Sequence, residues 1–477
     1  MHLTTPSDNT AASNSALPKE IFKAYDIRGI VGKTLTAPIV EQIGQALGSE
    51  AKHRGQTEIC IGYDGRLSGP ELAAALSAGI RKAGVNVVNL GMVATPMVYF
   101  AAYHLNTHCG VMVTGSHNPP DYNGLKMVLA GETLSNDAIQ SLRERIEHKQ
   151  FTYGDGLERQ YNIADDYINT IKADINLTRP MKIAVDCGNG VAGAFAKTLF
   201  NAIGCSVDEL FCEVDGHFPN HHPDPSVPEN LADLIEALTT SRAEIGLAFD
   251  GDGDRLGVVT KDGNIIYPDR QLMLFAEDVL NNNYAANIIF DVKSTRNLTP
   301  WITKFGGNPI LWKTGHSLVK AKIKETNAAL AGEMSGHVFF NDSKNGKKRW
   351  YGFDDGLYSG ARLLEILSRF PNPSDVLNNL PDSVSTPEQH IHMNEGEPHA
   401  LISQLQKTAD FIGANEIITI DGLRVEYPDG FGLMRPSNTT PVIVLRFEAD
   451  NETALKRIQT QFKDIIWEAA PHVAIPF

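Results

Sequence analysis

The chain has 477 residues, of which 42% are hydrophobic and 21% charged, with 42 Lys and Arg against 57 Asp and Glu. This length predicts several domains, and the ordinary composition excludes collagen-like and low-complexity architectures. The formal net charge of −15 argues against general binding to nucleic acid or anionic membranes, which need positive surface. A small anionic substrate held by a few local cations remains compatible with it.

Cysteine usage and the N-terminus indicate a cytoplasmic protein. The cysteines show no C-x-x-C spacing and sit beside apolar residues, which is typical of small buried hydrophobes. They are Cys60, Cys109, Cys187, Cys205 and Cys212. No stretch approaches the roughly 18 apolar residues of a membrane span. Residues 1–19 are rich in Ser, Thr, Asn and Ala, and we expect a disordered tail rather than a signal peptide.

Apolar strands alternate with helical segments in the first third of the chain. "EICIGYD" at 58–64 is strand-like, 70–84 has helical spacing and ends in Gly, and 85–91 is strand-like again. A helix near 96–105 and a strand at 109–116 follow. This alternation predicts βαβ units.

The same pattern recurs twice. Strands run into Gly-bearing loops at 181–190 and 244–254, and a third block extends from 287–295 to 330–337. We interpret these blocks as three repeats of one α/β unit with mixed, mainly parallel sheets.

The last hundred residues differ. A polar, Pro-rich stretch at 371–388 resembles a linker, and helices near 400–412 and 452–469 flank antiparallel strands, which predicts a smaller α+β domain. The predicted organisation is a tail at 1–19, α/β domains at 20–161, 162–263 and 264–378, and an α+β domain at 379–477.

The first loop with chemical potential is "VTGSHNPPDYNGLK" at 113–126. Ser116 follows an apolar strand, so its hydroxyl is expected at the strand's exposed carboxyl end, where parallel sheets bind ligands. The hydrolase pattern G-x-S-x-G is absent because Thr114 and Asn118 occupy its glycine positions. The alternative interpretation is an ordinary Ser in a turn.

Three aspartates alternate with glycines in "AFDGDGDRLG". Asp250, Asp252 and Asp254 would repel one another unless a cation held them, which indicates a hard metal ion such as Mg²⁺, shared with a phosphate. An EF-hand is excluded because Arg255 and Lys261 stand where it needs Gly and Glu. A solvated acidic turn is the alternative.

Two later loops are weaker signals when taken alone. In "AGEMSGH", Glu333 and Ser335 could hydrogen-bond sugar hydroxyls, and His337 could exchange protons near neutral pH. In "RPSNTTP", the guanidinium of Arg435, several hydroxyls and an amide could cradle a phosphate. No G-x-x-x-x-G-K-[ST] nucleotide loop occurs.

Two further clusters have simpler explanations. His217, His221 and His222 match no common zinc spacing and suit a Pro-rich turn. "KNGKKRW" at 344–350 is the one dense basic run, and a solvated loop explains it better than nucleic-acid binding.

Together and in this order, the motifs are specific. The chain resembles the α-D-phosphohexomutase superfamily, most closely its bacterial phosphomannomutase/phosphoglucomutase branch, from about residue 20 to the end. The matching segments are "FKAYDIRG" (22–29), "GYDGRLSG" (62–69), "TGSHNPPDYNGLK" (114–126), "FPNHHPDP" (218–225), "DGDGDR" (250–255), "WKTGHS" (312–317), "GEMSGH" (332–337), "GFDDG" (352–356) and "RPSNTTP" (435–441).

The resemblance implies a fold and a reaction. It implies three related α/β domains and a C-terminal α+β domain around a central cleft, in a cytoplasmic protein that we expect to be a monomer. It also implies a mutase that interconverts hexose 6-phosphates and hexose 1-phosphates of mannose, glucose or both. The reaction would use a phosphoserine, one Mg²⁺ and a hexose 1,6-bisphosphate intermediate, with phosphosugars as the ligands.

The resemblance also assigns roles to residues of this chain. Ser116 matches the phosphoserine, and with Asp250, Asp252 and Asp254 it would complete the metal site. Arg255, Lys126, His337 and Arg28 match catalytic positions, of which Lys126 and His337 are alternative proton-transfer groups. The expected substrate contacts are Tyr25, Lys293, His316, Glu333, Ser335, Arg435, Ser437, Asn438, Thr439 and Arg446.

Three rival functions remain open from sequence. A phosphoglucosamine mutase would usually have Gln in the sugar loop and "RPSGTEP" near the end, from which Asn438-Thr439-Thr440 departs. A phosphoserine-dependent sugar phosphatase would release free phosphate, and a sugar-phosphate-binding protein would show no turnover. The segment 341–349 is longer than the turn usual in this family.

Overall fold

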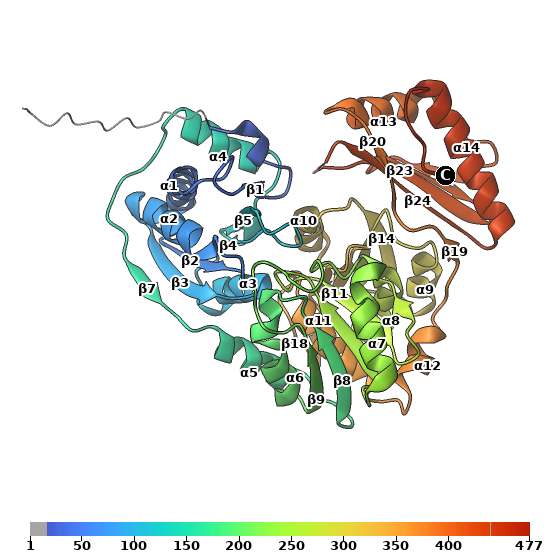
Figure 1. Ribbon diagram of the computed structural model, residues 1–477, viewed down its shortest axis with the longest axis horizontal. Coiled ribbons are helices and arrows are strands. Elements are labelled where there is room, and N and C mark those ends of the chain that lie inside the picture. The colour runs from blue at the N-terminus through green and yellow to red at the C-terminus, as the bar shows by residue number, and fades with distance from the viewer. Residues whose placement is uncertain (1–16, 439) are drawn as a thin grey trace, which may run out of the picture.

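The computed structural model describes residues 17–438 and 440–477, so most of the expected tail lies outside the described residues. Within them the chain forms a seven-, a five-, a four- and a six-stranded sheet in succession, plus a two-stranded hairpin. The first three units and the C-terminal unit can be followed by colour in Figure 1.

The first sheet has the strand order β1-β5-β4-β2-β3-β7, with β6 beside β5. Its strands are β1 (Ile27–Ile30), β2 (Glu58–Tyr63), β3 (Asn86–Met92), β4 (Gly110–Val113), β5 (Tyr122–Leu129), β6 (Glu132–Thr133) and β7 (Glu158–Gln160). Its helices are α1 (Ala37–His53), α2 (Gly69–Lys82), α3 (Thr95–His104) and α4 (Asp137–Glu147), after a short 3₁₀ turn at Lys19–Ile21.

The second sheet has the order β12-β11-β10-β8-β9. Its strands are β8 (Met181–Asp186), β9 (Cys205–Leu210), β10 (Ile245–Phe249), β11 (Leu256–Thr260) and β12 (Ile265–Ile266). The associated helices are α5 (Ala164–Asp174), α6 (Ala196–Ala202) and α7 (Ala232–Thr240), with 3₁₀ turns at Val191–Ala194 and Pro228–Leu231. Through β12 this sheet extends three residues past 263.

The third sheet has the order β14-β13-β15-β16. Its strands are β13 (Asn287–Asp291), β14 (Asn308–Trp312), β15 (Leu330–Gly332) and β16 (Val338–Phe340), followed by the hairpin of β17 (Ser343–Lys344) and β18 (Lys347–Lys348). Its helices are α8 (Pro268–Leu280), α9 (Leu298–Lys304), α10 (His316–Thr326), α11 (Gly356–Leu367) and α12 (Pro373–Asn378).

One strand order recurs in all three sheets and confirms the repeat. In β3-β2-β4-β5, β9-β8-β10-β11 and β14-β13-β15-β16, two parallel pairings are followed by one antiparallel pairing. The antiparallel pair is joined each time by the loop that the sequence singled out. Those loops contain Ser116, the three aspartates, and the segment from Glu333 to His337. The repeat therefore places three functional loops at equivalent positions.

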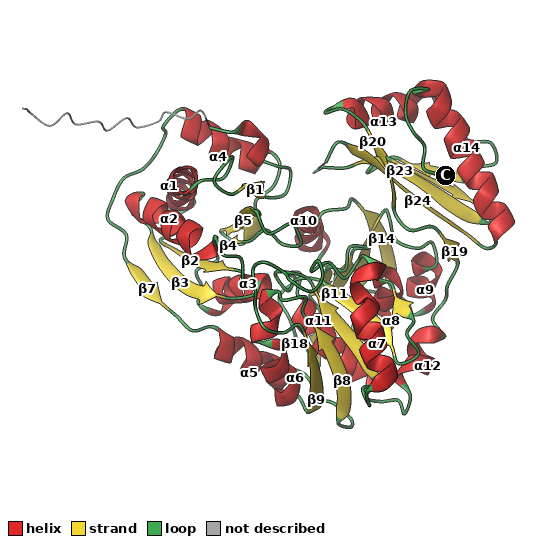
Figure 2. Cartoon of the chain, in the orientation of Figure 1, coloured by secondary structure: helices red, strands yellow, loops and turns green. Residues whose placement is uncertain are grey.

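The C-terminal sheet is antiparallel, as expected, but its strands at 384–385, 389–392 and 430–436 were not predicted from the sequence pattern. Its strands are β19 (Val384–Ser385), β20 (Gln389–His392), β21 (Glu416–Ile418), β22 (Leu423–Tyr427), β23 (Gly430–Pro436) and β24 (Val442–Ala449). Two glycines and a proline weaken the strand signal of β23, yet it pairs with β22 and β24 on its two sides. Helices α13 (Glu397–Thr408) and α14 (Glu452–Ala469) cover one face (Figure 2).

The expected linker at 371–388 is in fact partly structured. It contains α12, which contacts β11 of the second sheet, and β19, which pairs with β24. The first unit has its own apolar cluster and contributes α3 to a larger cluster that joins it to the second and third units, whereas the cluster of the C-terminal unit is separate. A small cluster of Val292, Phe431 and Leu433 bridges the third and fourth units.

Candidate active site

Ser116 lies in the loop between β4 and β5, buried and with a left-handed backbone at φ 51°. Its hydroxyl is 3.2 Å from Nδ1 of His117 and donates to Oδ2 of Asp250 at 3.4 Å. A non-glycine residue in this conformation is uncommon and persists only where its surroundings hold it. The structure therefore brings the predicted nucleophile to the predicted metal loop of the second domain.

The guanidinium of Arg66 binds the backbone of the loop that contains Ser116. It is almost fully buried and donates to the backbone carbonyls of Ser116 at 2.8 Å and Tyr122 at 2.9 Å, as well as to two carbonyls between them. Asp64 pairs with Arg66 and accepts a hydrogen bond from the Thr114 hydroxyl at 2.7 Å. Arg66 lies in the segment "GYDGRLSG", but its contacts with the backbone of this loop were not predicted from the sequence.

The three aspartates converge as predicted. Asp250, Asp252 and Asp254 have no exposed side-chain surface, and each offers a carboxylate oxygen within 4.8 Å of the others. Burial and repulsion from Asp254 and Asp252 raise the pKa of Asp250 well above its ordinary value. Oδ1 of Asp252 is buried without a hydrogen-bond partner among the described residues. An oxygen-rich set with an unsatisfied carboxylate oxygen fits a hard divalent cation.

The ammonium group of Lys126 partly neutralises this cluster. It donates to Oδ2 of Asp252 at 2.8 Å and to Oδ2 of Asp254. Although burial alone would lower it, the two carboxylates raise the pKa of Lys126 above its ordinary value. Lys126 is therefore a cation at neutral pH, in the form that donates a proton. The Thr95 hydroxyl, at the start of α3, also donates to Asp252, and sequence reasoning missed it.

Arg255 and His337 complete the reacting end of the site. Nε of Arg255 lies 3.7 Å from Asp250 and 3.4 Å from Nε2 of His337, and Nη1 lies 3.8 Å from Asp224. Burial raises the pKa of Asp224, but His117 and Arg255 outweigh this effect and hold it at about 2. Asp224 lies in "FPNHHPDP" and was not predicted as a site residue.

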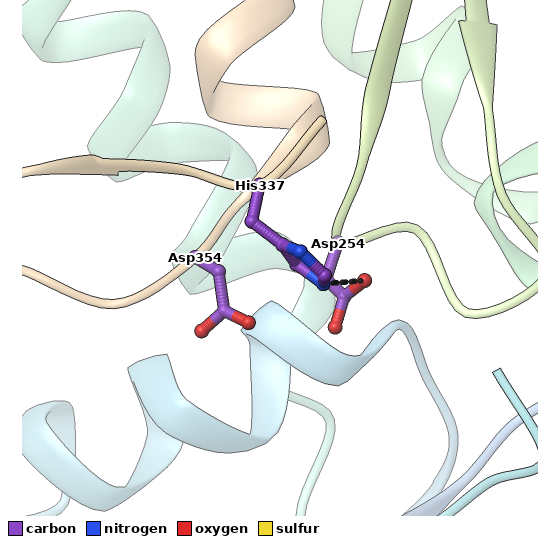
Figure 3. A group of neighbouring side chains, drawn as sticks. All are labelled: Asp254, His337 and Asp354. Carbon is purple, nitrogen blue, oxygen red and sulfur yellow. Dashed lines mark ion pairs between the residues drawn. The ribbon is translucent and has the colours of Figure 1, made fainter. Parts of the chain in front are cut away.

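Asp254, His337 and Asp354 form a second group of side chains that meet in space (Figure 3). Nε2 of His337 is 3.3 Å from Asp254, and Nδ1 of His337 lies 2.8 Å from the Ser335 hydroxyl. Asp354 accepts a hydrogen bond from Lys320 at 2.8 Å, so its charge is compensated. This group shares Asp254 with the cluster of three aspartates and extends it towards the loop from Glu333 to His337.

The predicted sugar-contact residues also gather here. Glu333 is buried, its pKa is raised by burial, and it accepts a hydrogen bond from the Gly315 N–H. The His316 ring stacks on the His337 ring with centroids 5.9 Å apart. Burial and the nearby Lys320 lower the pKa of His316 well below its ordinary value, so the ring is neutral.

Arg28 and Tyr25 connect the first domain to the other loops. Arg28, on β1, donates to the carbonyl of Gly115 at 2.7 Å and to the side chain of Asn118. The Tyr25 hydroxyl donates to the carbonyl of Thr314 at 2.9 Å and accepts from the side-chain amide of Asn438. Tyr25 therefore lies where the first, third and fourth domains meet.

The predicted phosphate cradle begins at the end of β23, which contains Arg435. Arg435 is buried and forms a two-point ion pair with Asp421, at 3.0 and 3.3 Å. Asp421 also accepts from the backbone N–H of Thr314 at 3.0 Å, which links the fourth domain to the third. The Ser437 hydroxyl accepts from the backbone N–H of Thr440. Thr439 lies outside the described residues.

Two residues predicted to contact the substrate, Lys293 and Arg446, form ion pairs at the boundary of the third and fourth domains. Lys293 donates to Glu388 at 2.9 Å, and Arg446 donates to Asp269 at 3.1 Å. Arg446 stands opposite Leu433 on the neighbouring strand. Its Nε and Nη1 atoms are buried without partners among the described residues.

Family models of known proteins match most of the chain. Four family models describe domains I, II and III, of the α/β/α type, and the C-terminal domain of phosphoglucomutase/phosphomannomutase. They match residues 19–153, 165–263, 267–384 and 390–465.

Individual relatives cover nearly all of it. The chain is 61% identical to a phosphoglucomutase of Neisseria meningitidis, covering 96% of this chain and 99% of that protein. It is 55% identical to a phosphomannomutase/phosphoglucomutase of Pseudomonas aeruginosa, covering 98% and 100%. A crystal structure of a phosphoglucomutase/phosphomannomutase family protein of Burkholderia thailandensis has a TM-score of 0.92 at 58% identity, covering 97% and 100%. The chain therefore belongs to the α-D-phosphohexomutase superfamily and is a mutase that interconverts hexose phosphates.

Proposed function

We propose that this enzyme moves phosphate between C6 and C1 of glucose and mannose through a phosphoserine at Ser116. The observation that carries the proposal is the contact of the Ser116 hydroxyl with the carboxylate cluster, next to Arg255 and Lys126. Phosphoryl transfer depends mainly on positioning and charge neutralisation, which this arrangement supplies.

The proposed reaction has two transfers. In the first, the bond between phosphorus and Oγ of Ser116 breaks, and the free hydroxyl oxygen of a hexose monophosphate bonds to phosphorus. That hydroxyl loses its proton to a group in the site, and a hexose 1,6-bisphosphate results. Oγ of Ser116, as the leaving oxygen, takes up a proton. After the bisphosphate reverses its orientation, Oγ of Ser116 loses this proton and bonds to the other phosphorus. The bond between that phosphorus and the sugar oxygen breaks, and the sugar oxygen takes up a proton. No nucleotide is consumed, because the enzyme itself stores the phosphoryl group.

The residues present fit Mg²⁺, which would neutralise charge on the transferring phosphoryl group when bound. Asp250, Asp252, Asp254 and the phosphorylated Ser116 would hold it. Binding of Mg²⁺ can be measured by calorimetry, and Asp252→Asn should weaken it while leaving the circular dichroism spectrum unchanged. Equal affinity in the variant would contradict this ligand set.

The substrate must bind in two orientations, so its distal phosphate and its ring need separate partners. We assign the distal phosphate to Arg435, Ser437, Asn438 and Thr439, and the sugar hydroxyls to Glu333 and Ser335. We assign His316 and Tyr25 to further contacts with the substrate, and Lys293 as well if it leaves Glu388. Arg446 would reach the phosphate only by leaving Asp269, and we include it on that condition.

The deciding experiment compares mannose 1-phosphate, glucose 1-phosphate and glucosamine 1-phosphate, with Mg²⁺ and a trace of hexose 1,6-bisphosphate. Turnover of the first two to their 6-phosphates is the expected result. Glucosamine-only turnover would indicate a phosphoglucosamine mutase, and release of free phosphate a phosphatase. Tight binding with no turnover would indicate a sugar-phosphate-binding protein.

We also propose that the enzyme acts as a cytoplasmic monomer. All five cysteines are free thiols, which suits a reducing compartment. Among the described residues, no helix combines the length and apolarity needed to cross a bilayer. The domain limits that we propose are 20–161, 162–263, 264–378 and 379–477, although β12 of the second sheet lies just past the second limit. Gel filtration with light scattering tests the monomer.

A further inference from the structure

A cavity of about 840 Å³ opens between the first and third domains, lined by none of the catalytic or substrate-binding residues assigned above. On the first-domain side its wall is formed by the end of α1, by α3, and by the segment from β5 to α4. On the third-domain side it is formed by α10 and by residues 341–353, which include the basic hairpin of β17 and β18. The cavity is in the size range of small-molecule sites.

The wall of this cavity carries an excess of positive charge. Four cations line it, namely Arg54, Lys320, Lys324 and Lys348, against the two acids Glu132 and Glu325. Glu132 is shared by Arg54 at 3.1 Å and Lys324 at 3.7 Å. Arg54 also pairs with Glu50, and Lys320 with Asp354, each at 2.8 Å, and neither of these acids lines the cavity. Glu325 is paired with Lys322, which does not line the cavity, at 2.6 Å. In a chain of net charge −15, such a local excess favours an anionic ligand.

Lys348 has an exposed side chain without an ion-pair partner among the described residues, and the protein atoms around it still desolvate its ammonium group enough to lower its pKa. Its neighbour Lys344 lies 3.8 Å from Glu365, so the hairpin cations differ in their surroundings. An ammonium group that is partly desolvated without a carboxylate gains most from a bound anion. This is the same basic run that the sequence singled out as a solvated loop.

An aromatic surface adjoins these cations. Tyr103 is 38% exposed, and its ring stacks on that of Tyr351 at 5.1 Å with an interplanar angle of 20°. The ring of Phe353 lies 6.1 Å away at 27°. All three residues line the cavity. A partly exposed ring whose orientation is fixed by stacked neighbours can stack with a planar ligand ring.

The cavity also shares a wall with the active site. The ammonium of Lys320 lies 4.2 Å from the centre of the Tyr99 ring and donates to Asp354, which faces His316 at 3.8 Å. The Tyr99 hydroxyl is buried without a hydrogen-bond partner among the described residues. A ligand beside Lys320 and Tyr99 would therefore lie one residue away from the catalytic network.

We propose that this cavity is a second binding site, which takes a small anion that joins a planar ring to a diphosphate, as a nucleoside diphosphate does. The ring stacks on Tyr103, and the diphosphate is held by Lys348 and Lys324. This site goes beyond the mutase reaction, which uses no nucleotide.

The test is calorimetric titration of the full-length enzyme with ADP at low ionic strength and without Mg²⁺. We expect the double variant Lys324→Ala/Lys348→Ala to bind ADP at least about tenfold more weakly. Lys347→Ala is the matched control, because Lys347 is in the same hairpin but does not line the cavity, and its affinity should be unchanged. Tyr103→Ala should lose the preference for ADP over inorganic pyrophosphate.

Three outcomes would overturn the proposal. These are equal ADP affinity in the wild type and the double variant, loss of ADP binding when glucose 1,6-bisphosphate saturates the enzyme, and equal affinity of the wild type for ADP and pyrophosphate. Retained mutase turnover in the double variant would show that it is folded, so that its loss of ADP binding counts as support. Because binding is measured directly, the result is independent of which sugar the mutase prefers.

Discussion

The two ends of the active site are held in different ways. At the reacting end, Ser116, the three aspartates and Lys126 are buried, and they contact one another across the first two domains. At the distal end, Arg435 is held by Asp421 while Ser437 and Asn438 are partly exposed. The first end is organised before substrate arrives, whereas the second depends on where the fourth domain lies.

The cores explain this difference. The first domain has its own core, but through α3 it also contributes to a large apolar cluster shared with the second and third domains, and this cluster fixes their loops relative to one another. The fourth domain has a separate core and meets the third through a small cluster and ion pairs such as Lys293–Glu388. Small polar interfaces permit relative motion of domains. The following predictions would break or sharpen this comparison.

The largest effect is expected for Ser116→Ala. Without the hydroxyl no phosphoserine can form, and turnover should fall by about 10⁴-fold or more, while substrate affinity changes by no more than a few fold. Steady-state kinetics and calorimetry measure the two quantities. Turnover within about tenfold of the wild type would rule out the phosphoserine route.

Arg66→Met should lower the free energy of unfolding, because Arg66 stabilises the loop that contains Ser116. It removes a buried guanidinium that four carbonyls and Asp64 require, and leaves the Asp64 charge uncompensated. The expected loss in the free energy of unfolding is about 3–5 kcal/mol by urea denaturation. The control is Arg159→Met, which breaks an exposed pair with Glu58 and should cost less than about 1 kcal/mol. Similar losses in both variants would show that the loop is not held by Arg66.

Arg435→Ala tests the distal end. It removes a charge-assisted contact to the non-reacting phosphate, and KM should rise by roughly 10–100-fold with a smaller change in kcat. Arg457→Ala is the control, since Arg457 pairs with Asp429 on the surface of the same domain. A fall in kcat at constant KM would instead place Arg435 in the transfer step.

The smallest effect concerns Asp224, whose pKa is lowered to about 2 in the folded enzyme. A depressed carboxyl pKa contributes stability above the unfolded pKa, and this contribution is lost as pH falls through the folded pKa. The free energy of unfolding of the wild type should therefore exceed that of Asp224→Asn by about 1–2 kcal/mol near pH 6. This difference should shrink as the pH falls from about 4 to about 2. Urea unfolding at several pH values measures this difference in the free energy of unfolding. A difference that stays constant with pH would show that the pKa of Asp224 is not lowered in the folded enzyme.

Much of the site could be predicted because its signals are local. Asp residues that alternate with Gly place carboxylates close together, and their mutual repulsion indicates a bound cation. A polar loop after an apolar strand indicates where the strand ends. Arg66 and Thr95 carry no such local signal, because their importance comes from carbonyls and carboxylates that are distant in sequence. The strand β23 was missed for a similar reason, since pairing on both sides, and not alternation, makes it a strand.

The sequence by itself determined the three-fold repeat, the order of the functional loops and the residue types that phosphoryl transfer requires. Only the tertiary structure decided which of these residues meet. It placed Lys126 between two aspartates, turned Arg446 towards Asp269, and put the basic hairpin at a cavity. Local patterns reflect short-range propensity and burial, whereas convergence depends on how separate domains pack, and that packing joins residues hundreds of positions apart.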